Sequence, residues 1–158
     1  AGTSDFLTIA DALKTCSRQP VLVDKRGTLS VVKGLPLNMF LINAIDYEYG
    51  QELFDRLYAA MPLPDGEAEP MMNILCFKQG DTVNLVVIPR KRHRPSFYGT
   101  EGDDTMLLSP ASVDMGGVFI TPLEKDFNRI DAAVIRKIYD ELCLSDGDVA
   151  DIVNRLNK

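Results

Sequence analysis

The sequence predicts an α+β fold in which helices cover an antiparallel sheet. Two β-hairpin patterns lie before residue 90, and two amphipathic helical patterns lie after residue 130. Strands that come as hairpins pair antiparallel, and helices that follow as a separate block pack on the resulting sheet. No repeat or linker interrupts the 158 residues. We therefore expect a single domain over residues 1–158.

The first hairpin is predicted by two β-branched runs, Val21–Val23 and Leu29–Val32. Gly27 lies between them and supplies the turn. A further apolar run, Met39–Ile42, predicts a third strand. Before the hairpin, residues 5–16 have a weak helical pattern and are expected to form a short helix.

A longer helix is expected after Asp46, whose carboxylate can cap its first turn. Apolar residues then recur at helical spacing, namely Leu53, Phe54, Leu57, Tyr58 and Met61. Pro62 and Pro64 end this helix and open a loop that runs to Pro70.

The second hairpin joins Met71–Phe77 and Thr82–Ile88 through the tight turn Gln79-Gly80-Asp81. Two helices are expected near the C-terminus. Asp131 can cap the first, and Ser145 with Asp148 three residues later resembles a capping box for the second.

The overall charge and the cysteines limit the classes of function. A net charge of −6 argues against a surface that coats nucleic acid, because such binding neutralises many phosphates. No apolar run reaches the roughly 18–20 residues of a membrane helix, and no signal-peptide pattern opens the chain. We expect a cytoplasmic protein whose cysteines, Cys16, Cys76 and Cys143, are buried structural thiols without a metal or cofactor.

The first candidate site is a run of basic residues after the second hairpin, consisting of Arg90, Lys91, Arg92, His93 and Arg94. Adjacent like charges favour an anionic ligand, and the planar arginine group suits phosphate. The alternative is a solvated loop, or one paired with the acidic residues Glu101, Asp103 and Asp104. His93 is the only histidine, so a Cys–His hydrolase would require Cys76 beside it.

The second candidate site is the loop of small residues from Ser109 to Gly117. Small side chains allow backbone N–H groups to approach a phosphate or a sugar closely. Ser109 and Ser112 would line such a site, and Asp114 could bond a ribose hydroxyl. The alternative is a bulge or close packing against a helix. Residues 121–126 add an expected helix start, which also favours anions.

Three segments occur in an order that is similar to a known group of enzymes. They are Met72-Asn73-Ile74-Leu75, Val87-Ile88-Pro89-Arg90 and the stretch from Leu108 to Pro122. Together they resemble an uncharacterised bacterial family of the histidine-triad-like (HIT-like) superfamily, related to GDP-L-galactose phosphorylase and diadenosine tetraphosphate phosphorylase. The likeness is good over residues 70–125 and looser elsewhere, and it implies a HIT-like fold.

The resemblance implies transfer of a nucleotidyl group through a nucleophilic histidine in an HxHxQ motif. This chain has no such motif, so it looks like the C-terminal portion of a larger HIT-like domain, inactive without its N-terminal half. The expected partners are a nucleotide or nucleotide-sugar, the missing half and a second copy. The phosphate-contacting residues would be Asn73, Arg90, Lys91, Arg92, His93, Arg94, Ser109, Ser112 and Asp114. The alternative is a non-catalytic nucleotide- or protein-binding module.

Overall fold

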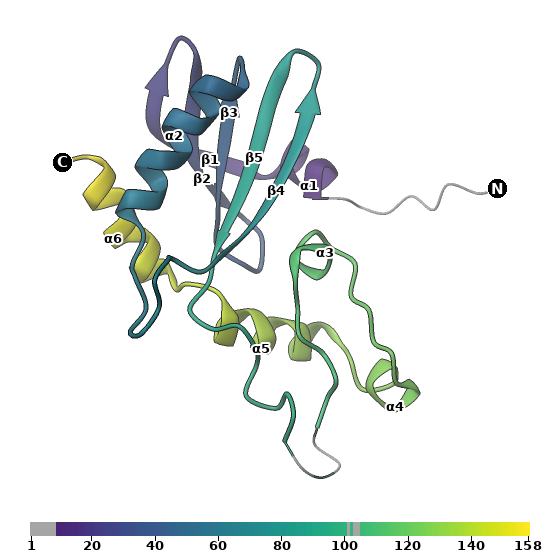
Figure 1. The fold of residues 1–158 in the computed structure, drawn as a ribbon. Helices are drawn as coiled ribbons and strands as arrows, with labels where there is room; N and C mark the ends of the chain where they lie inside the picture. Colours follow the sequence, from purple (N-terminus) through teal and green to yellow (C-terminus); the bar gives the residue numbers. More distant parts are fainter. Residues whose placement is uncertain (1–8, 101, 103–104) are drawn as a thin grey trace.

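The computed structural model describes residues 9–100, 102 and 105–158, and it has the expected α+β architecture (Figure 1). The strands are β1 (Ser17–Asp24), β2 (Gly27–Lys33), β3 (Met39–Ala44), β4 (Met72–Gln79) and β5 (Thr82–Pro89). The helices are α1 (Ile9–Thr15), α2 (Tyr47–Ala60), α3 (Ser112–Met115), α4 (Glu124–Phe127), α5 (Ala132–Leu142) and α6 (Asp146–Leu156).

The five strands form one antiparallel sheet in the order β1-β2-β3-β5-β4. Both predicted hairpins and the predicted third strand are therefore confirmed. Strand β5 inserts between β3 and β4, because helix α2 carries the chain past the position that β5 later fills. This order leaves β1 and β4 as the two edges of the sheet.

The expected turn at Gly27 requires correction, because Lys25 and Arg26 form the turn of the first hairpin and Gly27 is the first residue of β2. Gly27 begins β2 opposite Ala44, and a Cβ at Gly27 would lie 2.2 Å from the carbonyl oxygen of Asn43. No side chain fits at that separation, so β2 and β3 can approach only with glycine there. In the second hairpin, Gly80 has a φ of +60°, the left-handed conformation that glycine adopts without steric cost.

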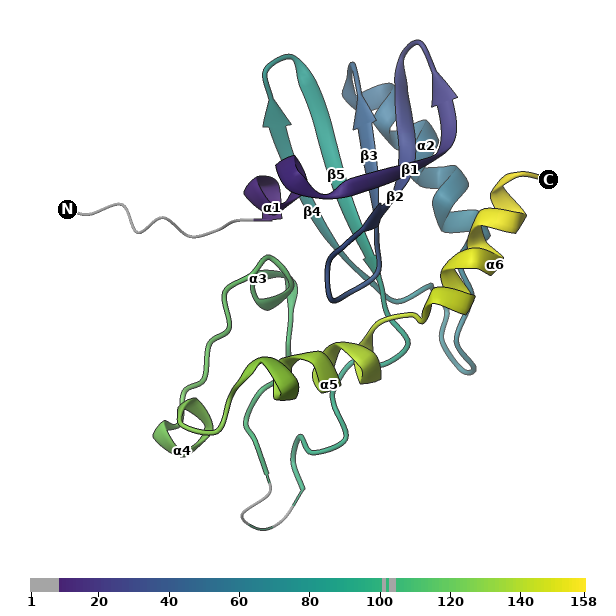
Figure 2. The same cartoon turned by 180° about the vertical axis from the view of Figure 1, so that it is seen from behind.

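The sheet carries a hydrophobic cluster on each face. Along β3, Phe40 and Ile42 pack into the cluster that α2 and α6 cover, whereas Met39 and Leu41 pack into the opposite one. The second cluster receives α1, α5 and residues 106–115. Figures 1 and 2 show α1 and α2 on opposite faces of the sheet. This alternation follows from the period of two along a strand.

The predicted helix caps are confirmed. The carboxylate of Asp46 accepts from the backbone N–H of Tyr49 at 2.8 Å, and Asp131 caps α5 in the same way. Ser145 and Asp148 form the expected capping box at the start of α6. Each cap satisfies backbone N–H groups that the first turn of a helix leaves without partners.

Some expectations require correction. Cys76 is exposed on β4 and Cys16 is only half-buried, so of the three thiols Cys143 alone is buried as expected. Cys76 is exposed because β4 is an edge strand. The loop of small residues contains a short helix, α3. The expected helix start within 121–126 is confirmed, since α4 begins at Glu124, but this helix has only four residues. Residues 5–8 of the first expected helix lie outside the described residues.

No helix in the described part of the chain is long and apolar enough to cross a membrane.

Candidate functional site

Arg90 is the centre of the candidate site. Arg90 follows directly after β5, and its backbone N–H donates to the carbonyl of Met71 at 2.8 Å. It also forms an isolated antiparallel β-bridge with Cys143. Only 8% of Arg90 is exposed. An arginine at the first position of a basic run is thus folded into the protein rather than displayed on its surface.

The guanidinium group of Arg90 donates four hydrogen bonds. Nε donates to the carbonyl of Arg92 at 3.1 Å, and Nη2 donates to the carbonyl of His93 at 2.7 Å. Nη1 donates to the carbonyl of Pro110 at 2.7 Å and to Oδ1 of Asn73 at 2.8 Å. The group therefore ties together the basic run, strand β4 and the segment before α3.

All four acceptors are neutral, and no carboxylate contacts this guanidinium among the residues that the structure describes. Burial lowers the pKa of Arg90 from its ordinary value, while the electrostatic influence of Cys143 and Asp114 acts in the opposite direction and raises it. A guanidinium group has five N–H donors, so one N–H on Nη2 has no protein acceptor in the described structure. The site thus holds a buried guanidinium cation with one N–H group that is available to a ligand.

Asn73 is fixed beside Arg90 by its own hydrogen bonds. Because arginine can only donate, Asn73 must present its oxygen to Arg90, and its Nδ2 then donates to Oγ of Ser112 at 3.2 Å. That leaves a second Nδ2 N–H uncommitted. Asn73 lies opposite Ile88 in the β4–β5 register, which places it two residues from the level of Arg90 at the same end of the sheet.

Asp114 has a structural task in the described fold. Its carboxylate accepts from the backbone N–H of Ala111 at 2.9 Å and from that of Ile120 at 3.3 Å. It is 8% exposed and holds the turn around α3 closed. Its two oxygens keep acceptor capacity beyond these bonds, so the predicted contact with a ribose hydroxyl is limited by the burial of Asp114. Ser109 is half-buried nearby in sequence, with no hydrogen bond from its side chain in the described structure.

A surface pocket of about 430 Å³ opens beside Arg90. Its lining runs along the chain from Glu67 to Asn73 and is completed by Arg90 and His93. His93 is largely exposed, and its Nε2 lies 3.8 Å from a carboxylate oxygen of Glu67. The lining therefore combines two residues with hydrogen-bond donors, Arg90 and Asn73, with two acidic residues, Glu67 and Glu69.

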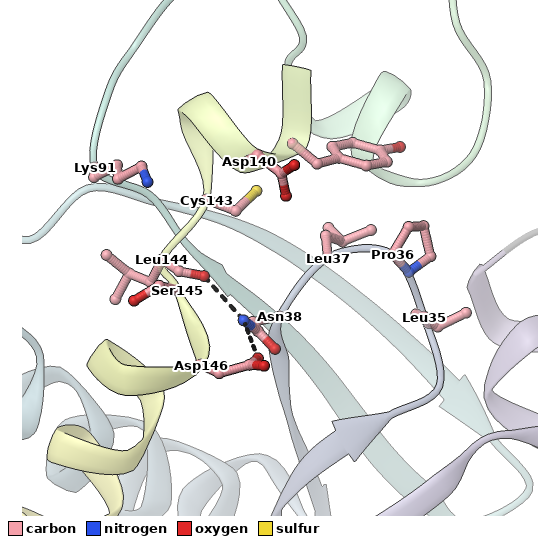
Figure 3. A pocket seen from close by; sticks show the side chains of 11 residues that line it. Leu35, Pro36, Leu37, Asn38, Lys91, Asp140, Cys143, Leu144, Ser145 and Asp146 are labelled. Carbon is pink, nitrogen blue, oxygen red and sulfur yellow. Dashed lines mark hydrogen bonds between the residues drawn. The ribbon is translucent and has the colours of Figure 1, made fainter. Parts of the chain in front are cut away.

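The remaining members of the basic run separate. Arg92 is exposed, and the guanidinium carbon of Arg94 lies 4.4 Å from the centre of the Tyr98 ring. Lys91 lines a different pocket, of about 420 Å³, between the β2–β3 loop and the junction of α5 and α6 (Figure 3). Five adjacent basic residues thus do not form one anion site. The acidic partners considered for them, Glu101, Asp103 and Asp104, lie outside the described residues.

The pocket beside Lys91 is held in shape by Asn38. Its Nδ2 donates to the carbonyl of Leu144 and to the carboxylate of Asp146, both at 3.0 Å (Figure 3). Cys143 lines this pocket, and burial raises the pKa of its thiol to about 11. A thiol with that pKa is protonated at neutral pH and is a poor nucleophile.

A Cys–His hydrolase has no geometric support in the described structure. Cys76 lies opposite Leu85, well inside β4, whereas His93 follows the end of β5 and contacts Glu67. The hydrogen bonds and ion pairs of the described residues do not join Cys76 to His93. In the same part of the chain, no group of three or more His, Cys, Asp or Glu side chains could hold a metal ion.

The sequence did not point to Glu67, Glu69 or the carbonyl of Pro110 as parts of the site. Glu67 and Glu69 lie in a loop that the sequence marks only by its prolines, glycine and acids. No sequence pattern predicts that a backbone carbonyl contributes to a site. Comparison with family models, with curated proteins and with solved structures found no match for the chain.

Proposed function

We propose that this chain is the nucleotide-binding portion of a HIT-like nucleotidyltransferase or phosphorylase, acting on a nucleotide or nucleotide-sugar. In this proposal the pocket beside Arg90 receives a phosphate group. The observation that carries it is the buried Arg90 cation, which has neutral acceptors only and one uncommitted N–H.

A buried cation without a counter-ion favours an anion at its open side. Removing a charge from water costs several kcal/mol, and hydrogen bonds to neutral carbonyls offset only part of that cost. The spare N–H is on Nη2, the nitrogen that bonds the carbonyl of His93, and His93 lines the pocket. Together with the spare N–H of Asn73, it gives two donors for the oxygens of one phosphate group.

A second candidate is a non-catalytic binding module on the same scaffold. Two observations favour it over independent catalysis. The described lining of the Arg90 pocket contains no serine, threonine or cysteine, and its histidine, His93, is not part of an HxHxQ motif. Large apolar side chains at Val113, Ile120 and Phe127 are more than half exposed, which is typical of a surface that binds protein. An HxHxQ motif encoded directly upstream would favour the enzyme over the module.

The test of the phosphate site is Asn73→Asp. An aspartate can accept from Arg90 through one oxygen and from the Ser112 hydroxyl through the other, so the local hydrogen bonds are kept. The new carboxylate would lie about 6 Å from a bound phosphate, and at an effective dielectric constant of about 20 the repulsion is about 3 kcal/mol. Binding of uridine monophosphate, measured by isothermal titration calorimetry, should weaken by about 100-fold.

The matched control is Lys91→Gln, which also makes the net charge more negative by one but changes a residue of the other pocket. It should weaken binding less than about threefold, through the general field of the protein alone. Equal losses in the two variants, or no binding by the unchanged protein, would contradict the phosphate site. Circular dichroism of both variants establishes that the comparison concerns folded protein.

A further inference from the structure

We propose that Glu67 and Glu69 make the Arg90 pocket selective for ligands that combine a single phosphate group with a hydroxyl-bearing neutral part, and against polyphosphates. The inference rests on the proposed function, because it takes the Arg90–Asn73 part of the wall as the phosphate-binding end. It adds a specificity that neither the basic run nor the loop of small residues suggested.

The two carboxylates belong to the same pocket wall as Asn73. Residues 67–73 line the pocket without a break, as the chain leaves the loop after α2 and enters β4. The loop is held at Glu67 by a turn, in which its backbone N–H donates to the carbonyl of Pro64 at 3.1 Å. Across the pocket, His93 contacts the Glu67 carboxylate at 3.8 Å. Glu67 is exposed, and its position is defined by this backbone hydrogen bond and by the side-chain contact with His93.

The charges in this lining oppose a highly charged ligand. Arg90 supplies one fixed positive charge, whereas Glu67 and Glu69 supply two negative ones. A single phosphate group can reach the donors of Arg90 and Asn73 while its neutral part faces the acids. A triphosphate would extend negative charge toward those acids. Each exposed carboxylate should weaken its binding by about tenfold at a separation of about 8 Å and an effective dielectric constant of about 30.

The same carboxylates favour hydroxyl groups. An ionised carboxylate only accepts hydrogen bonds, and bonds to a charged acceptor are stronger than those between neutral groups. A pocket of about 430 Å³ is within the range of roughly 300–1,000 Å³ that holds small molecules. A phosphorylated monosaccharide or a nucleoside monophosphate has the required arrangement of one anionic end and several hydroxyls.

The experiment compares three probes, inorganic phosphate, glucose 6-phosphate and tripolyphosphate, by isothermal titration calorimetry. The unchanged protein should bind glucose 6-phosphate at least about tenfold more tightly than inorganic phosphate, and tripolyphosphate more weakly than glucose 6-phosphate. The double variant Glu67→Gln/Glu69→Gln should gain at least about tenfold in affinity for tripolyphosphate and lose most of its preference for the sugar phosphate.

The matched control is Asp65→Asn/Asp81→Asn, which removes two exposed negative charges that do not line the pocket. It should leave the order of the three probes unchanged. A single variant, Glu69→Gln, keeps the contact between Glu67 and His93 and should give about half of the logarithmic effect. This arm separates the loss of charge from any loosening of the loop.

The outcomes distinguish this inference from the proposed function. If none of the probes binds, or if binding survives Asn73→Asp, the phosphate site itself is wrong. If phosphate binds and is lost in Asn73→Asp, but the glutamine variants keep the order of the probes, only the role of Glu67 and Glu69 is wrong. Much tighter binding of glucosamine 6-phosphate than of glucose 6-phosphate would show that the acids recognise an ammonium group, and would overturn the hydroxyl assignment.

Discussion

Replacing Arg90 with lysine should lower the free energy of unfolding by about 3 kcal/mol. The substitution keeps the positive charge but changes the geometry of the donors. The guanidinium group reaches four acceptors on three separate segments, at 2.7–3.1 Å. An ammonium group has a single nitrogen, so its three N–H groups cannot span the same acceptors.

The magnitude follows from the bonds that are lost. At least two of the four acceptors would be left without a donor, and each lost hydrogen bond from a charged donor costs about 1.5 kcal/mol or more. The carbonyls of Arg92 and His93 are on an exposed loop and can turn to water. The carbonyl of Pro110 is buried and the side-chain oxygen of Asn73 is half-buried, so the cost falls mainly on these two acceptors. For a chain of this size, about 3 kcal/mol corresponds to a decrease in melting temperature of about 6–12 °C.

Urea denaturation followed by circular dichroism gives the free energy of unfolding, and Arg92→Lys is the matched control. It makes the same chemical change two residues away, at an exposed side chain, and should change stability by less than about 0.5 kcal/mol. A loss below about 1 kcal/mol for Arg90→Lys would refute the reasoning. It would mean that the four hydrogen bonds do not hold the site together.

Three further predictions concern the fold. Ser145→Ala should cost about 1 kcal/mol at neutral pH, since it removes the cap of α6. Because Ser145 lowers the pKa of Asp148, that stabilisation is present above the ordinary carboxyl pKa and lost as the pH falls through the lowered one, so urea curves of the two proteins should converge in acid. Iodoacetamide at pH 8 should alkylate Cys76 in the folded protein but Cys143 only after unfolding, because Cys143 is buried and its pKa is raised to about 11. Mass spectrometry of the labelled peptides measures the order of labelling, and labelling of Cys143 before Cys76 would contradict the prediction. Gly27→Ala should destabilise the protein by about 2 kcal/mol or more, because its Cβ would meet the carbonyl of Asn43, whereas Gly147→Ala, with space around it, should not; thermal melts compare the two.

Much of the fold could be predicted because its signals are local. Hairpin strands and the turns that join them lie within a few residues of each other, and a helix cap depends on a side chain and an N–H three residues apart. The exposed position of Cys76 could not be predicted in this way. It depends on β4 being an edge strand, and the order β1-β2-β3-β5-β4 is set by long-range pairing.

The candidate site shows the same difference between what local sequence signals predict and what long-range contacts decide. The sequence by itself determined that basic residues follow β5, that Asn73 belongs to an apolar strand and that Ser112 belongs to a loop of small residues. Only the tertiary structure decided that Arg90 is buried while Lys91 and Arg94 go elsewhere, and that Glu67 lies beside His93. The physical reason is that a buried guanidinium needs acceptors from several directions. Segments far apart in the chain supply these acceptors, and only the folded sheet brings those segments together.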